Sequence, residues 1–239
     1  MRLRVIDIET SGGQPSEIIE IAAVDVVGCP DEGGWRAEPA VSRLYRPLGE
    51  MSVHAMAVHH LTPSALAGCV PCCERELTAF LAALPPADAL VAHNAGFERD
   101  HIGPHATGGL PWICTLRAAR KAWPDAPAYS NQVLRYWRGV ALDDPRAMPP
   151  HRAAPDAWVT AHLLLDLLAE ASIEDLMAWT DAPRTLDRIP FGKHRGTPWA
   201  AIPADYLEWL LGRQDLSAEV AEAARKALEA RATAAEAAA

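Results

Sequence analysis

The chain has 239 residues, half of them hydrophobic, and a formal net charge of −9 at pH 7. No apolar stretch approaches the roughly 20 residues that a membrane-spanning helix needs, and the N-terminus lacks the basic and apolar segments of a secretory signal. The composition therefore excludes a membrane protein and a disordered one, and it predicts a globular, cytoplasmic protein with one substantial core.

The charge is unevenly distributed along the chain. Residues 1–94 carry 12 acidic and 6 basic side chains, whereas residues 95–140 carry 3 and 6. This balance argues against tight, sequence-independent coating of duplex nucleic acid, but it is compatible with an enzyme that holds nucleic acid briefly. The five cysteines are odd in number and irregularly spaced, which predicts free thiols without a disulfide framework.

The first predicted strand, Val5-Ile6-Asp7-Ile8-Glu9-Thr10, places two acids in an apolar run. Side chains alternate along a strand, so Asp7 and Glu9 share one face. Burying two like charges costs free energy that a divalent cation can offset. The alternative is an edge strand whose two acids face water.

Two further strands are predicted over residues 17–27 and 43–46, and the short loops between the three strands indicate an antiparallel meander. Helical patterns and a buried-strand pattern follow. The expected elements are a helix over 74–84, a strand over 89–92, a helix that begins near Phe97, and helices over 114–123, 131–137 and 155–171. This order predicts an α/β fold with a mixed sheet, meander first and parallel strands afterwards, flanked by helices.

The composition changes near Asp181, where prolines become frequent. Phe191-Gly192-Lys193-His194-Arg195-Gly196 is a basic turn between glycines, and a short helix is expected over 205–211. We expect three segments: a main domain over residues 1–175, a small basic and helical module over 183–213, and an Ala/Glu-rich tail over 214–239 that forms a fraying helix.

Two later motifs supply further acids. In the first, the strand over 89–92 ends in His93-Asn94-Ala95-Gly96, so that Glu98 lies on the first turn of the next helix. In the second, His151 precedes Asp156 by five residues at the start of the longest helix, and Pro155 suits a first-turn position.

Four carboxylates and one histidine define a specific chemistry. Oxygen ligands favour a hard cation such as Mg²⁺ or Mn²⁺ over zinc. Two such ions about 4 Å apart can hold both the attacking and the leaving oxygen of a phosphoryl displacement. A histidine, which titrates near neutral pH, is suited to taking a proton from the attacking water. The residues together predict metal-assisted phosphodiester hydrolysis.

The motifs D-I-E-T at 7–10, H-N-A-G-F-E at 93–98 and H-x-x-x-x-D at 151–156 resemble the three motifs of the DEDDh 3′→5′ exonucleases. Connecting segments extend the resemblance over roughly residues 2–211, including the basic turn at 191–196. Any one motif would be weak evidence. Three in the family's order are strong evidence, and they identify the chain as a member of this family.

The resemblance implies an RNase H-like sheet and 5′-mononucleotide products. Asp7 would bridge two metal ions, Glu9 and Asp156 would complete the site, and His151 would be the general base. Glu98 would be the remaining ligand, although the family usually has aspartate there. The 3′-terminal nucleotide is expected to lie at Thr10 and the 56–61 segment. Other parts of the substrate strand are expected to contact residues outside these two segments. The residues expected to make these contacts are Thr10, Met56, His59, Leu61, Asn94, Lys193 and Arg195.

The expected partner is DNA with a free 3′ end, single-stranded or duplex, and no oligomeric state is predicted. Two alternatives keep the same chemistry: RNA trimming, and proofreading beside a polymerase. A third, from another class, is a non-catalytic module that binds nucleic-acid ends, with Glu98 marking a lapsed metal site. For Lys193 and Arg195 the alternative is a solvated turn, and His93 is interpreted as structural.

Overall fold

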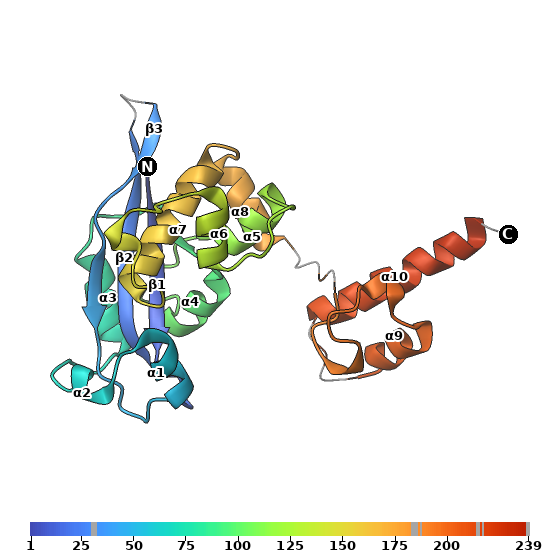
Figure 1. Cartoon of the computed structure of the whole chain (residues 1–239), viewed down its shortest axis with the longest axis horizontal. Helices are drawn as coiled ribbons and strands as arrows, with labels where there is room; N and C mark the ends of the chain where they lie inside the picture. Colours follow the sequence, from blue (N-terminus) through green and yellow to red (C-terminus); the bar gives the residue numbers. More distant parts are fainter. Residues whose placement is uncertain (30–32, 183–185, 187, 214–215, 217, 238–239) are drawn as a thin grey trace. The chain divides into compact units, whose positions relative to one another are not determined.

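The computed structural model describes residues 1–29, 33–182, 186, 188–213, 216 and 218–237. They form two compact units, Met1–Asp181 and Ala182–Ala239 (Figure 1). The first unit contains β1 (Arg2–Thr10), β2 (Ile18–Cys29), β3 (Gly34–Ala37), β4 (Val41–Leu44), α1 (Val53–His59), α2 (Pro63–Leu66), α3 (Glu74–Ala82), β5 (Ala89–Ala92), α4 (Ala95–Ile102), β6 (Trp112–Cys114), α5 (Thr115–Ala122), α6 (Asn131–Arg138), the 3₁₀ turn η1 (Pro145–Ala147), α7 (Ala153–Leu168) and α8 (Ile173–Asp181).

The strands form one mixed sheet in the order β3-β2-β1-β5-β6, with β4 paired to β2. β2 runs antiparallel to β1, β3 and β4, whereas β5 and β6 run parallel to β1. This arrangement confirms the predicted α/β class, an antiparallel meander followed by parallel strands. Parallel strands need crossover connections, and the helices supply them.

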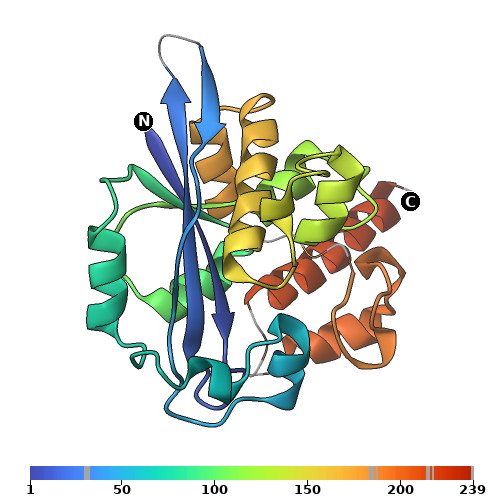
Figure 2. The same cartoon turned by 60° about the vertical axis from the view of Figure 1, so that its left-hand side comes forward.

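Helices cover both faces of the sheet, which is why β1 is buried along most of its length (Figure 2). Leu3 and Val5 pack in a core shared with α5 to α8, whereas Ile6 and Ile8 pack with α3 and α4 on the opposite face. Asp7 has the same parity as Leu3 and Val5. The two acids of β1 therefore face α7, the helix that begins just after His151 and carries Asp156.

The chain between α6 and α7 is anchored by the guanidinium of Arg135, which is 1% exposed. This guanidinium donates to the carbonyls of Ala141, Leu142 and Ala147. One buried cation thus satisfies three loop carbonyls that would otherwise lose their hydrogen bonds to water. The segment that leads to His151 is consequently fixed from inside the fold.

Several elements differ from the sequence-based expectation. The third predicted strand, 43–46, is β4 at Val41–Leu44, and the β2-β3 hairpin was not expected. The helix expected from residue 114 follows the three-residue strand β6, which is too short to show alternation. The helices α1, α2 and α8 were also not predicted. Each is short or interrupted by polar residues, so no apolar period marks it.

The second unit contains the 3₁₀ turns η2 (Gly192–His194) and η3 (Trp199–Ala201) and the helices α9 (Ala204–Leu211) and α10 (Ala218–Ala237). Its core joins Trp199, Leu207 and Leu210 to Val220 and Ala224 of α10. The segment expected as a fraying tail from 214 thus contributes α10 to the core of this unit. Within the described ranges, no helix is long and apolar enough to cross a membrane.

Candidate active site

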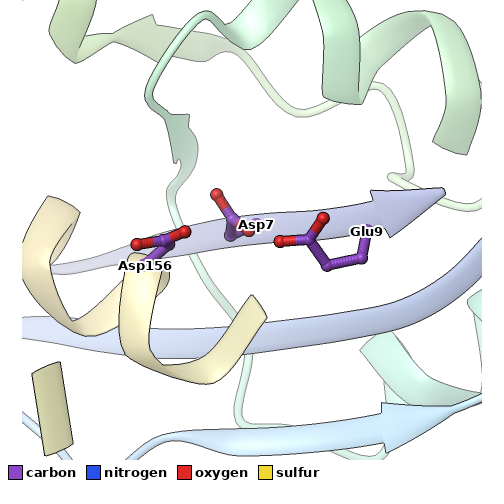
Figure 3. A group of neighbouring side chains, drawn as sticks. All are labelled: Asp7, Glu9 and Asp156. Carbon is purple, nitrogen blue, oxygen red and sulfur yellow. The ribbon is translucent and has the colours of Figure 1, made fainter. Parts of the chain in front are cut away.

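Three carboxylates converge between β1 and the N-terminal end of α7. Asp7 and Glu9 extend from the strand and Asp156 from the helix, and all three point into one space (Figure 3). One oxygen from each lies within 4.8 Å of the others. The alternation of β1 supplies two acids on one face, and α7 brings the third acid to that face.

The cluster is electrostatically unfavourable by itself. Burial, followed by repulsion from Asp156, Glu98 and Glu9, raises the pKa of Asp7 well above its ordinary value. Burial and the charge of Asp156 raise the pKa of Glu9 to about 8. Like charges held together out of water favour protonation unless a cation neutralises them. These carboxylates are therefore suited to binding a cation.

Glu98 lies on the first turn of α4 and is 3% exposed. Burial, with a smaller contribution from Glu9, raises the pKa of Glu98 to about 8. Its oxygens fall outside the group formed by the other three acids. Its Oε2 atom is buried and, among the residues that the structure describes, has no hydrogen-bond partner. A buried carboxylate oxygen without a donor fits a position that faces a cation. The donor set of oxygens suits Mg²⁺ or Mn²⁺.

Asp156 is oriented by two hydrogen bonds from the chain. Its Oδ1 accepts from the Gln132 amide at 3.0 Å and its Oδ2 from the His151 backbone N–H at 2.7 Å. These donors lower the pKa of Asp156, although burial outweighs them and the net shift is upward. Gln132 was not identified from the sequence as a residue of the site. Its only sequence signal is its position in the first turn of a helix, near other polar residues.

His151 lies just before α7, and its side chain is exposed. Its backbone has φ +60°, a left-handed conformation that few non-glycine residues adopt. This conformation turns the backbone N–H toward Asp156 while the imidazole remains accessible to solvent. The structure therefore places the two members of the third motif side by side.

An ion pair holds the residues that follow His151. Arg152 donates from Nε and Nη2 to the two oxygens of Glu20, at 2.8 and 2.9 Å, and the Ala153 N–H donates to the same carboxylate. Glu20 stands opposite Glu9 in the β1-β2 register. Arg152 thus neutralises a fifth acid beside the cluster and ties the start of α7 to the sheet. The available sequence signal was an acid, Glu20, within a largely apolar strand that also contains Asp25.

The predicted substrate residues occupy different environments. Thr10 ends β1 and Met56 lies on α1, and both are half-buried, whereas Asn94 is exposed at the left-handed N-cap of α4. His59 and Leu61 are buried, and the ring Nδ1 of His59 accepts from the Leu61 N–H. These two therefore pack beneath the surface of their segment.

Lys193 and Arg195, the remaining predicted substrate residues, belong to the second unit, where both are exposed. They are considered below with that unit.

His93 supports the turn that leads to Glu98. Its Nε2 bonds to the Tyr129 carbonyl at 2.8 Å and its Nδ1 to the Thr115 hydroxyl at 2.9 Å. Since a carbonyl only accepts, Nε2 carries the proton and Nδ1 accepts from Thr115. Burial lowers the pKa of His93 to about 4. The side chain is consequently neutral and structural.

This environment predicts an acid-sensitive fold. The unfolded chain protonates His93 below about pH 6.5, whereas the folded protein resists protonation down to about pH 4, so its stability falls through that window. We expect this residue to cost about 2–3 kcal/mol of unfolding free energy between pH 7 and pH 4. Urea denaturation of the wild type and of His93→Gln at both pH values tests it. Equal acid losses in the two proteins would contradict the assignment.

Comparison with known proteins defines the class. The sequence model of the exonuclease family (RNase_T) matches residues 5–164, which include Asp7, Glu9, Glu98 and Asp156. The chain belongs to this family of exonucleases, which confirms both the resemblance and the expectation of an enzyme. Members generally use divalent metal ions, in agreement with the carboxylate cluster.

Individual relatives narrow the comparison. The chain is 34% identical over 218 residues to exodeoxyribonuclease 10 of Escherichia coli strain K12, covering 89% of this chain and 92% of the relative. The structure of exonuclease X in complex with 5′ overhanging duplex DNA matches with a TM-score of 0.60 and 32% identity, over 74% of this chain and 99% of that one. A full-length 3′-exonuclease matches at 14% identity, over 71% of this chain and 60% of that one, with a TM-score of 0.55, a likeness that shows a shared fold alone.

Proposed function

We propose that the chain is a 3′→5′ exodeoxyribonuclease that releases 5′-mononucleotides from DNA 3′ ends by hydrolysis with two divalent metal ions. The observation that carries the proposal is the convergence of Asp7, Glu9 and Asp156, with the unpartnered Glu98 oxygen nearby. The relative named exodeoxyribonuclease 10 and the exonuclease X complex with duplex DNA support DNA as the substrate. A cytoplasmic location is part of the proposal.

In this proposal the metal ligands are Asp7, Glu9, Glu98 and Asp156, and the ions are Mg²⁺ or Mn²⁺. When bound, the ions supply positive charge that stabilises the charge developing on the phosphoryl oxygens. The chain's own contribution is to orient the acids. Gln132 and the His151 N–H fix Asp156, and β1 fixes Asp7 and Glu9 at one face.

His151 is proposed as the general base. Its backbone N–H is bonded to Asp156 and its side chain is exposed. In this proposal the imidazole accepts a proton from a water molecule as that water attacks the terminal phosphodiester. The bond between phosphorus and the departing 3′ oxygen breaks, which leaves the phosphate on the released nucleotide. The half-buried Thr10 and Met56 and the exposed Asn94 are proposed contacts of that nucleotide.

The direction of attack and the substrate are tested with end-labelled strands. A single strand of DNA labelled at its 5′ end should give a ladder of shortened products in Mg²⁺ or Mn²⁺ and none in EDTA. The same strand labelled at its 3′ end should release labelled mononucleotide at once. Faster cleavage of the matching RNA would favour RNA trimming, and binding without cleavage in either metal would favour the non-catalytic alternative.

Replacing Glu98 with aspartate is expected to raise the ratio of the Mg²⁺-supported rate to the Mn²⁺-supported rate several-fold. Mg²⁺ demands near-ideal octahedral geometry, and one methylene fewer moves the carboxylate by about a bond length. Initial rates on a single-stranded DNA in each metal measure the ratio. Glu174→Asp, an exposed position on α8, is the matched control. An unchanged ratio would show that Glu98 does not govern metal preference.

A further inference from the structure

The second unit carries an exposed aromatic surface that the carboxylate site does not use. Tyr206, Trp209 and Arg213 follow one another at i, i+3 and i+7 along α9 and the turn after it, so they lie on one side. Trp209 is 53% exposed, whereas Trp199 of the same unit is 6% exposed and packs in its core. Packing in the core of this unit therefore does not explain the presence of a tryptophan at position 209.

Cations stand at both ends of this pair of rings. The Tyr206 and Trp209 ring centroids are 5.2 Å apart. The Lys193 Nζ lies 5.0 Å from the centre of the Tyr206 ring, and the Arg213 guanidinium lies 5.3 Å from the Trp209 ring. We call Lys193, Tyr206, Trp209 and Arg213 the aromatic row. Its order of cation, ring, ring and cation offers a stacking surface between positive charges.

The basic turn is built onto this row. Gly192 has φ +68°, a conformation that favours glycine, and a Cβ at this position would lie 3.0 Å from the Tyr206 hydroxyl. The Arg195 N–H donates to the Gly192 carbonyl at 3.1 Å, which closes the turn. Lys193 and Arg195 are both exposed, and across the part of the chain that the structure describes neither forms a salt bridge. Two charges are thus presented from a fixed backbone.

The local charge is opposite to that of the chain. Between residues 188 and 213 there are four basic and two acidic side chains, within a protein whose net charge is −9. A polyanion complements such a surface, and exposed rings stack on unpaired bases of any sequence. Duplex DNA offers phosphates but no free base face. The features together favour a single strand.

We propose that the aromatic row and Arg195 bind a single strand of DNA, with a base stacked on Trp209 and phosphates at Lys193 and Arg195. The choice of DNA rests on the proposed function. The surface would hold the substrate strand by contacts that are independent of base sequence and separate from the carboxylate cluster.

The test is the affinity of the full chain for a fluorescein-labelled oligothymidylate, measured by fluorescence anisotropy in EDTA. Trp209→Ala should weaken binding about tenfold, and Trp209→Phe should recover part of the loss because a ring remains. Lys193→Ala/Arg195→Ala should reduce the slope of log K against log salt by about 1.4, since each phosphate contact on a single strand contributes about 0.7.

The control variant is Arg225→Ala/Lys226→Ala, which removes the same charge from α10, where both cations pair with Glu222. It should keep the wild-type affinity and salt slope. Wild-type binding by the Trp209 and Lys193/Arg195 variants, or equal weakening by the control, would overturn the proposal. So would an equal effect of Trp209→Ala on binding to a blunt duplex. Because hydrolysis is not measured, an inactive protein that binds through this surface would refute the proposed function alone.

Discussion

Replacing Asp7 with asparagine is expected to reduce DNA hydrolysis about a thousandfold or more, while making the metal-free protein more stable. The rate falls because the side chain proposed to hold the metal ions loses its charge. The stability rises because Asp7 is half-buried near Asp156, Glu98 and Glu9, and its raised pKa marks an ionised form that the folded state disfavours. Hydrolysis of a 5′-labelled strand and thermal unfolding in EDTA measure the two effects.

The raised pKa of Asp7 also determines how the stability gain of the variant changes with pH. A carboxylate whose pKa is raised by folding destabilises the protein progressively as pH rises above its unfolded pKa, near 4. The gain from Asp7→Asn should therefore be small at pH 5 and larger at pH 8, where the variant should unfold at a higher temperature than the wild type. Adding Mg²⁺ or Mn²⁺ should stabilise the wild type and leave the variant unchanged.

Asp100→Asn is the matched control, since Asp100 is an exposed acid on the same helix as Glu98. It should alter neither activity nor unfolding temperature. A metal-free Asp7→Asn protein that is less stable than the wild type would show that the cluster is held by hydrogen bonds within the chain and does not need a cation. Retained hydrolysis would exclude Asp7 from the site.

Replacing His151 with asparagine is expected to reduce the catalytic rate between about a hundredfold and ten-thousandfold, the range for loss of a general base. Asparagine tolerates the left-handed backbone at this position better than alanine does. It also retains the backbone N–H that donates to Asp156. The variant therefore removes the imidazole while preserving the local fold.

Binding distinguishes a catalytic from a structural effect of this change. The affinity of His151→Asn for a DNA strand in EDTA should equal that of the wild type, and single-turnover rates in Mg²⁺ should carry the whole loss. His105→Asn, at an exposed loop position, is the control and should change neither quantity. Parallel losses of rate and affinity would instead assign His151 to substrate binding or to the support of Asp156.

Local periodicity predicts where each acid of the cluster lies on its own strand or helix. Asp7 and Glu9 share a face because strand side chains alternate. Pro155 indicates that Asp156 lies near a helix start, although the helix begins at Ala153. Both deductions need only neighbouring residues. That these elements meet depends on long-range pairing, and here the resemblance of three ordered motifs supplied what local pattern could not.

The long-range interactions that support the site could not be predicted from the sequence. Glu20 and Arg152 are 132 residues apart and meet only because β2 and the start of α7 pack together. Arg135 looks like an ordinary surface residue of an amphipathic helix, yet its guanidinium is buried against loop carbonyls. Charged residues are rarely buried, so the sequence did not predict that Glu20 and Arg135 would be buried in the fold.

The central claim is that the four acids hold divalent metal ions, and anomalous scattering from crystals soaked in Mn²⁺ with thymidine 5′-monophosphate tests it most directly. We expect strong peaks at the cluster, beside oxygens of Asp7 and within reach of Glu9, Asp156 and Glu98. The Asp7→Asn crystal should lose them. Wild-type crystals with no peak at these carboxylates, or with Mn²⁺ bound only elsewhere, would contradict the claim.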